Sequence, residues 1–134
     1  MFKILGKSDE QTTCDACGKS NLKATVVLES ESTGIVRYGV DCASRALKGN
    51  AKHANKKQIE HQSNAIQFAR ENIAQFGVIT PRLATEIFNR FGYCAEVRGD
   101  TLLIQIEREA HKWWTNAVIT KNGIEYRTNH VASY

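Results

Sequence analysis

Residues 14–42 open with Cys-Asp-Ala-Cys-Gly and close with Tyr-Gly-Val-Asp-Cys, and this segment organises the N-terminal third of the chain. In the Cys-Asp-Ala-Cys-Gly segment the two-residue spacing lets two thiolates converge on one cation. Gly18 allows the tight turn that points both side chains the same way. Tetrahedral Zn²⁺ needs four ligands, and a Cys-x2-Cys step commonly supplies half of them. The sequence therefore predicts that Cys14 and Cys17 form a zinc-binding knuckle.

The segment between the cysteines is typical of a β-hairpin. Residues 22–29 alternate apolar and polar side chains, which predicts a half-buried strand. Residues 30–34 read Ser-Glu-Ser-Thr-Gly and are typical of a turn, and residues 35–38 begin the return strand. The hairpin brings the chain back to the knuckle, so we expect Cys42 to arrive there as the third ligand.

A knuckle, a hairpin and a cysteine at the start of a helix resemble a treble-clef zinc finger. The helix is predicted over residues 42–47, with Asp41 as its N-cap. The resemblance covers residues 12–53 and implies that the Zn²⁺ is structural. It departs from the pattern at Arg45, because a treble clef usually takes a second ligand from the helix at that point.

The fourth ligand must therefore come from elsewhere in the chain. His53, past the end of the short helix, is the first candidate, and Cys94 and His61 follow. Three cysteines and one histidine are a common ligand set of structural zinc. In the alternative interpretation the cysteines carry no metal and pack as small buried hydrophobic residues.

The length of the chain indicates one domain or two small domains packed together. It has 134 residues, enough to fold alone, although its first third is too short to do so without help. The N-terminus, Met-Phe-Lys-Ile-Leu-Gly, lacks the apolar core of a signal peptide, and no apolar run approaches the roughly 20 residues of a membrane span. We expect a soluble, cytoplasmic protein without disulfides, because reducing compartments keep thiols free.

A long helix is predicted over residues 54–76. Ile59, Ile66 and Ile73 recur every seven residues and form a narrow apolar stripe. Two interpretations of the stripe stay open: it packs on the rest of the domain, or it joins two copies of the chain into a homodimer. Gly77 is placed to end the helix.

The remaining segments predict one more helix and two hairpins. Thr80-Pro81 opens a helix that Gly92 ends, because proline is well tolerated at the first helical position. The first hairpin has strands at 93–97 and 101–106, which flank Arg-Gly-Asp, and its second strand is expected to place Leu102, Ile104 and Ile106 on one face. The second hairpin has strands at 117–121 and 124–128, which flank Asn-Gly, a strong hairpin signal. Residues 111–114 are expected to connect the two hairpins, with a short helix as the candidate conformation.

These elements predict an α+β fold. A treble-clef-like zinc lobe occupies residues 1–53, and a long helix, a second helix and antiparallel hairpins occupy residues 54–134. Because no flexible linker separates the two parts, we expect them to pack as one compact unit.

The charge pattern indicates nucleic acid, DNA or RNA, as the first candidate partner. The net charge is +4, and the positive residues crowd near the proposed zinc site: Lys48, Lys52, Lys56 and Lys57. Lysines that replace phosphate counterions give binding that depends strongly on salt. The leading hypothesis is thus a small zinc-binding protein that binds nucleic acid and acts as a regulator. In the alternative interpretation the lysines form a solvated helix surface.

A protein partner is the second candidate. Trp113 and Trp114 are adjacent, and tryptophan is enriched both where bases stack and where proteins meet. A protein-interaction or modulator module would use this pair together with the long helix.

Signals of catalysis are missing from the sequence. It contains no Gly-x-Ser-x-Gly elbow, no His-Glu-x-x-His helix and no phosphate-binding Gly-x4-Gly-Lys-Ser/Thr loop. A zinc shell rich in thiolates is usually closed and structural. We therefore expect a binding protein and not an enzyme.

Overall fold

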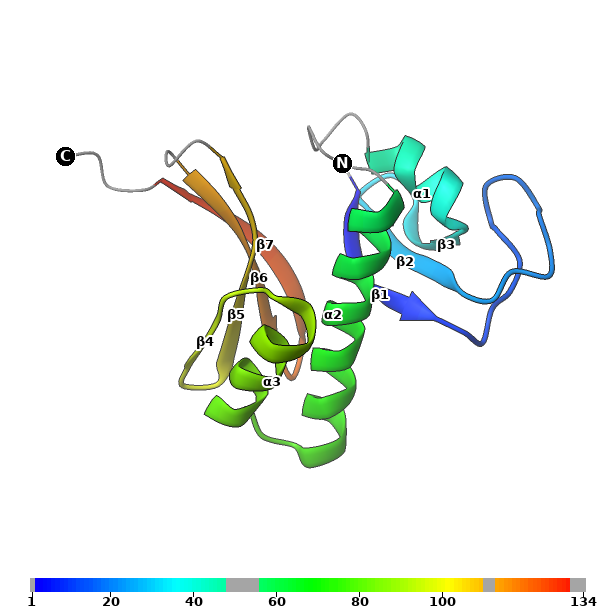
Figure 1. Cartoon of the computed structure of the whole chain (residues 1–134). Coiled ribbons are helices and arrows are strands. Elements are labelled where there is room, and N and C mark those ends of the chain that lie inside the picture. The colour runs from blue at the N-terminus through cyan, green and yellow to red at the C-terminus, as the bar shows by residue number, and fades with distance from the viewer. Residues whose placement is uncertain (1, 48–55, 110–112, 131–134) are drawn as a thin grey trace. The chain divides into compact units, whose positions relative to one another are not determined.

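The computed structural model describes residues 2–47, 56–109 and 113–130, apart from the side chains of 107–109, 113–115 and 128–130. These residues form three helices and two antiparallel sheets, which confirms the predicted α+β class (Figure 1). The chain divides into two units, Met1–Gln67 and Phe68–Tyr134. The predicted lobe boundary between 53 and 54 lies outside the described residues and stays a prediction.

The first unit contains the predicted hairpin as part of a three-stranded sheet. Its strands are β1 (Lys3–Ser8), β2 (Thr25–Ser30) and β3 (Gly34–Tyr38), in the order β1-β2-β3. Strand β2 begins at Thr25 and not at residue 22, because the chain before it turns through Asn21, whose φ is 59°. Val26 and Leu28 of β2 are buried and give the unit its apolar core.

Helix α1 (Val40–Leu47) begins earlier than the sequence indicates. The N–H of Ala43 donates to the carbonyl oxygen of Gly39 at 2.9 Å, so Gly39 and not Asp41 stands at the cap. The predicted N-cap role of Asp41 is therefore wrong. Its carboxylate lies in the first turn, where the helix dipole favours a negative charge.

A bulge interrupts the pairing of β1 with β2 between Ile4 and Gly6. Gly6 has φ 151°, a backbone conformation that side chains rarely adopt. The side-chain oxygen of Gln67 approaches Gly6 closely and accepts the N–H of Lys7 at 3.0 Å. Gln67 therefore stabilises the bulge in β1, and its side chain fits there because Gly6 has no Cβ.

Helix α2 (Lys56–Phe76) buries the predicted seven-residue stripe within one chain. Ile59, Ile66 and Ile73 are all at most 4% exposed. This confirms the interpretation that the stripe packs within the chain, whereas a homodimer through the long helix stays a prediction. As expected, the N–H of Gly77 closes the helix on the carbonyl of Ile73 at 2.8 Å.

Helix α3 (Pro81–Phe91) begins and ends where the sequence predicts. Thr80 is the extended N-cap, without a side-chain capping bond, and Pro81 follows in the first turn. Gly92 ends the helix with φ 77° and donates its N–H to the carbonyl oxygen of Phe88.

Among the described residues, no helix combines the length and apolar character that crossing a membrane requires.

The second unit contains a four-stranded sheet in the order β4-β5-β6-β7. The strands are β4 (Ala95–Arg98), β5 (Thr101–Glu109), β6 (Trp113–Thr120) and β7 (Gly123–His130). Both predicted hairpins are present, and the pairing of β5 with β6 joins them.

Three details of this sheet differ from the sequence predictions. Trp113 and Trp114 belong to β6 and not to a helical connection, whereas residues 111 and 112 lie outside the described residues. Because Thr120 pairs with Gly123, the last turn has Lys121 and Asn122 at its centre, one residue earlier than the Asn-Gly pair. A register shift between Gln105 and Glu107 leaves Ile106 without a paired residue on β6, an irregularity that the alternating pattern does not predict.

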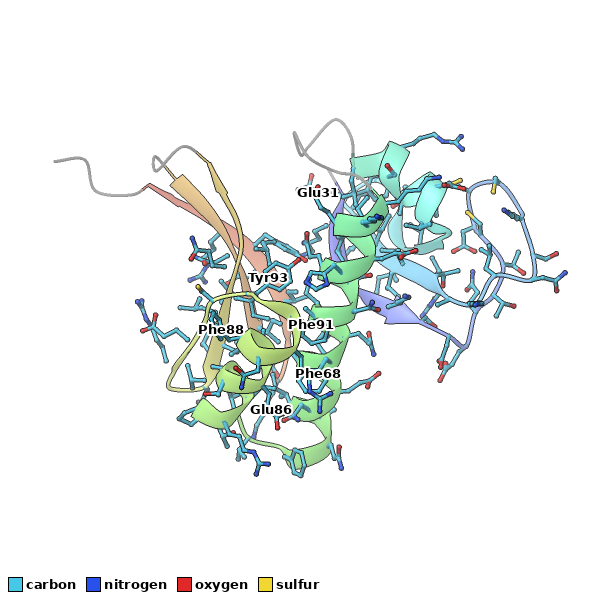
Figure 2. The ribbon with its side chains drawn as sticks, viewed as in Figure 1. Glu31, Phe68, Glu86, Phe88, Phe91 and Tyr93 are labelled. Atoms are coloured by element: carbon cyan, nitrogen blue, oxygen red, sulfur yellow. The ribbon has the colours of Figure 1, made fainter. Side chains whose placement is uncertain are left out.

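One face of the sheet forms the core of the second unit. Leu102, Ile104, Ala117 and Ile119 are all fully buried there, and helix α3 adds Leu83 and Ile87. Phe91 of α3 lies beside Phe68 of α2, with ring centroids 5.7 Å apart (Figure 2). The guanidinium of Arg90 stacks over the Phe68 ring at 4.7 Å, which adds a cation–π contact.

We predict that Gly6→Ala destabilises the protein more than Gly34→Ala. Both glycines have positive φ, but only at Gly6 would a Cβ meet a neighbouring side chain. Gly34→Ala should lower the free energy of unfolding by about 1–2 kcal/mol, and Gly6→Ala by about 3 kcal/mol because the Gln67 contact is lost as well. Urea unfolding measures both values, and equal losses would contradict this account of the bulge.

Candidate metal centre

Three cysteine sulfurs converge in the first unit. Cys14, Cys17 and Cys42 place their Sγ atoms within 4.8 Å of one another. A tetrahedral site with the usual zinc–sulfur bonds would hold its sulfurs roughly 3.8 Å apart. Small side-chain adjustments are therefore enough for all three to bind one cation. Cys14 is buried, Cys42 half-buried and Cys17 exposed.

The backbone between β1 and β2 builds the predicted knuckle. The N–H of Gly18 donates to the carbonyl of Cys14, and the N–H of Cys14 donates to the carbonyl of Lys19, both at 2.9 Å. Gly18 has φ 76°, so glycine suits this turn. The turn is closed by its own backbone and places the two sulfurs on one side.

Asp15 fastens the knuckle to the hairpin. Its N–H donates to the carbonyl of Arg37 on β3 at 2.8 Å, and its Oδ2 accepts the N–H of Arg37 at 2.8 Å. Its Oδ1 accepts the side-chain amide of Gln11 at 2.8 Å. This role of Asp15 was not predicted from the sequence, although aspartate commonly accepts backbone hydrogen bonds in turns. These bonds hold the knuckle against the strand that leads to Cys42.

Backbone donors stabilise the Cys14 thiolate. Burial raises the pKa of Cys14, but the N–H groups of Cys17, Gly39 and Ala16 donate to its sulfur, and the pKa falls to about 7. A thiolate held by several N–H groups is ready to bind a cation.

Burial and the other two sulfurs together raise the pKa of the Cys42 thiol. Its pKa rises to about 11 because of burial first and then because of the neighbouring Cys17 and Cys14. Three thiolates this close repel one another, so full ionisation needs a positive charge among them. The electrostatics of the cluster therefore favour a bound cation.

The predicted fourth ligand stays a prediction. His53 lies outside the described residues, as do Lys48 and Lys52. His61 is exposed on α2 and is not a member of the three-sulfur group, and Cys94 is an exposed residue of the second unit.

One predicted lysine contacts the helix that carries Cys42. Lys56 pairs with the carboxylate of Asp41, and this contact lowers the pKa of Asp41, with smaller effects from Lys19 and Arg45. The pair links the start of α2 to the first turn of α1. Lys57 is exposed.

The site defines a class of protein: an α+β chain in which three cysteines from a knuckle and a helix are positioned to bind a metal ion. A comparison of the chain with protein-family models, curated proteins and solved structures finds no match.

We predict that Asp15→Ala loosens the knuckle, because the N–H of Arg37 and the Gln11 amide lose their acceptor. The free energy of unfolding of the metal-loaded protein should fall by about 1–2 kcal/mol. Asp9→Ala removes the same charge from an exposed residue before the knuckle and should change it little. Equal effects of the two variants in urea unfolding would contradict the role of Asp15.

Proposed function

We propose that this chain is a small zinc-binding protein whose first unit is shaped by the metal and binds nucleic acid. In this proposal Cys14, Cys17, Cys42 and His53 hold one Zn²⁺ in a treble-clef-like arrangement. The observation that carries it is the convergence of three sulfurs within 4.8 Å, from segments far apart in the sequence.

The ligand chemistry favours zinc. Thiolates are soft ligands, and protein sites rich in sulfur and tetrahedral in geometry select zinc or iron–sulfur clusters. The knuckle and a single helical cysteine fit a mononuclear site, and a nitrogen ligand would complete the Cys3His set of structural zinc.

The proposed metal acts on folding and not on a reaction. The first unit builds its core on a three-stranded sheet, and a lobe of this size gains much of its stability from a bound metal. A site closed by four protein ligands leaves no position for a substrate. We therefore propose a binding protein without catalytic activity.

Exposed cations around the cysteines support nucleic acid as the partner. Lys19 follows the knuckle, Arg45 lies on α1 and Lys57 on α2, and all three are exposed. Together with the lysines at 48 and 52, they give this lobe charges that could replace phosphate counterions. The net charge of +4 agrees in sign.

A protein-interaction module is the second candidate function. Exposed apolar side chains in the second unit favour it: Phe76, Val78 and Phe88 are each more than half exposed. Large exposed apolar residues mark protein interfaces where they form a contiguous patch. Trp113 and Trp114 of β6 would extend such an interface.

We predict that the purified protein contains one zinc per chain. Cys14→Ser, Cys17→Ser and Cys42→Ser should each lower the zinc content and the unfolding temperature, since a metal-dependent lobe loses its main stabilising ligand. His53→Ala should do the same, whereas Cys94→Ser and His61→Ala should not. Elemental analysis and thermal unfolding measure these effects; full zinc content in the three serine variants would contradict the site.

We predict that the zinc-loaded protein binds nucleic acid with strong salt dependence. Replacing Lys48, Lys52 and Lys57 by alanine should weaken binding and reduce the slope of log affinity against log salt by about 2 to 3, because each lost phosphate contact removes nearly one unit. Lys121→Ala, an exposed cation of the second unit, is the control. Fluorescence anisotropy gives both quantities, and no binding at low salt would exclude the proposed partner.

A further inference from the structure

Strand β4 is an edge strand of the sheet in the second unit. The strand order is β4-β5-β6-β7, so β4 has β5 on one side and no strand of the described chain on the other (Figure 1). An edge strand presents backbone N–H and carbonyl groups that can pair with a further strand, unless a bulge or a proline prevents it. The register of β4 with β5 is continuous and β4 contains no proline, so neither device protects this edge.

The hydrogen bonds between β4 and β5 show which backbone groups point outward. The N–H of Gln105 donates to the carbonyl oxygen of Cys94 at 2.8 Å, so the backbone of Cys94 faces β5. This direction alternates along an antiparallel strand, and the N–H and carbonyl groups of Ala95 and Val97 therefore point away from β5. A strand that pairs with the open edge would form its hydrogen bonds with these two residues.

The charges on β4 are complementary to a second copy of the same strand. Glu96 and Arg98 lie on either side of Val97 and form an exposed ion pair at 3.1 Å, and such exposed pairs are weak enough to exchange partners. When two β4 strands pair in antiparallel orientation about a two-fold axis at Val97, Glu96 of each copy lies opposite Arg98 of the other. Both pairs occupy positions without backbone hydrogen bonds, where facing side chains are closest.

Charge also disfavours the neighbouring registers of this strand pair. An axis at Glu96 would place the two Glu96 carboxylates opposite each other, and an axis at Arg98 would do the same with the two guanidinium groups. Like charges directly opposite one another destabilise paired strands. The order of the side chains therefore specifies one register for the pairing of β4 with itself.

The other face of the strand adds an apolar contact. Val97 pairs with the fully buried Leu102, so its side chain lies on the face of the sheet that α3 covers. Phe88 of α3 is 55% exposed, and Figure 2 shows it on the side of α3 nearer β4, away from Phe68. A second copy would bring its own Val97 and Phe88 to the same place. Pairing of the two edges would therefore remove apolar surface of both copies from water.

We propose that the protein forms a homodimer in which the β4 strands of two copies pair in antiparallel orientation about Val97, so that two four-stranded sheets become one continuous sheet. A second copy fits this edge because the order Glu96-Val97-Arg98 is complementary to itself. The contact is small, so the dimer is weak and its population depends on protein concentration. The proposal is independent of the metal centre and of nucleic acid, since β4 and α3 both belong to the second unit.

Sedimentation equilibrium of the full-length protein over a series of concentrations measures the dissociation constant of the dimer. Glu96→Arg should raise this constant roughly ten-fold, because two attractive cross-strand pairs become repulsive. Arg98→Glu should raise it by a similar factor for the same reason. An equimolar mixture of the two variants should form a heterodimer about as stable as the wild-type dimer, because every charge of one variant then faces the opposite charge of the other.

The chain offers matched controls for the charge and for the apolar contact. Glu125 and Arg127 form the same kind of exposed pair on β7, the other edge strand, and Glu125→Arg should leave the dissociation constant unchanged. Phe88→Ala should raise it several-fold, whereas Phe76→Ala, at a similarly exposed phenylalanine of α2, should not.

A wild-type protein that stays monomeric at the highest concentration overturns the proposal. A dimer that dissociates in Glu125→Arg but not in Glu96→Arg uses β7 and also overturns it. The same holds for a dimer that none of these variants weakens, because its interface then lies elsewhere. Failure of the mixed charge variants to associate would contradict the proposed register.

Discussion

The convergence of the Cys14, Cys17 and Cys42 sulfurs is the constraint on which the first unit depends. The knuckle and helix α1 are separated by a whole hairpin in the sequence, yet their sulfurs lie within 4.8 Å of one another. Three thiolates at this separation repel one another, and the neighbouring Cys17 and Cys14 contribute, after burial, to the raised pKa of Cys42. A divalent cation resolves this repulsion and would tie the two segments together.

The rest of the unit is arranged to present these sulfurs. Asp15 joins the knuckle to Arg37 of β3 through its backbone N–H and its carboxylate, and Gly39 lies against Cys14, where its N–H reaches the sulfur. A Cβ at Gly39 would crowd the side chain of Leu22, at 3.2 Å. The hairpin thus acts as a spacer whose length brings Cys42 back to the knuckle.

The features that depend on neighbouring residues could be predicted from the sequence. The Cys-x2-Cys-Gly knuckle, the Thr80-Pro81 helix start and the alternating strands are encoded within a few neighbouring residues, and the structure agrees with them. The apolar stripe of α2 was also recognisable, because its period is regular.

The features that could not be predicted from the sequence depend on residues far apart in the chain. The bulges at Gly6 and after Gln105 arise from cross-strand register, which no single strand reveals. Asp41 was assigned as a cap because its residue type fits that role, but the backbone of Gly39 already accepts the first helical bond. The burial of Asn116 on β6 is equally invisible in the sequence, since asparagine is mostly exposed in proteins.

The central claim is that one zinc ion joins three sulfurs of the first unit. X-ray absorption at the zinc edge of the purified protein tests it most directly, because the first coordination shell reports ligand type and distance. The account predicts three sulfurs at about 2.3 Å and one nitrogen at about 2.0 Å. A protein that binds no zinc, or a shell of oxygen and nitrogen alone, would contradict it.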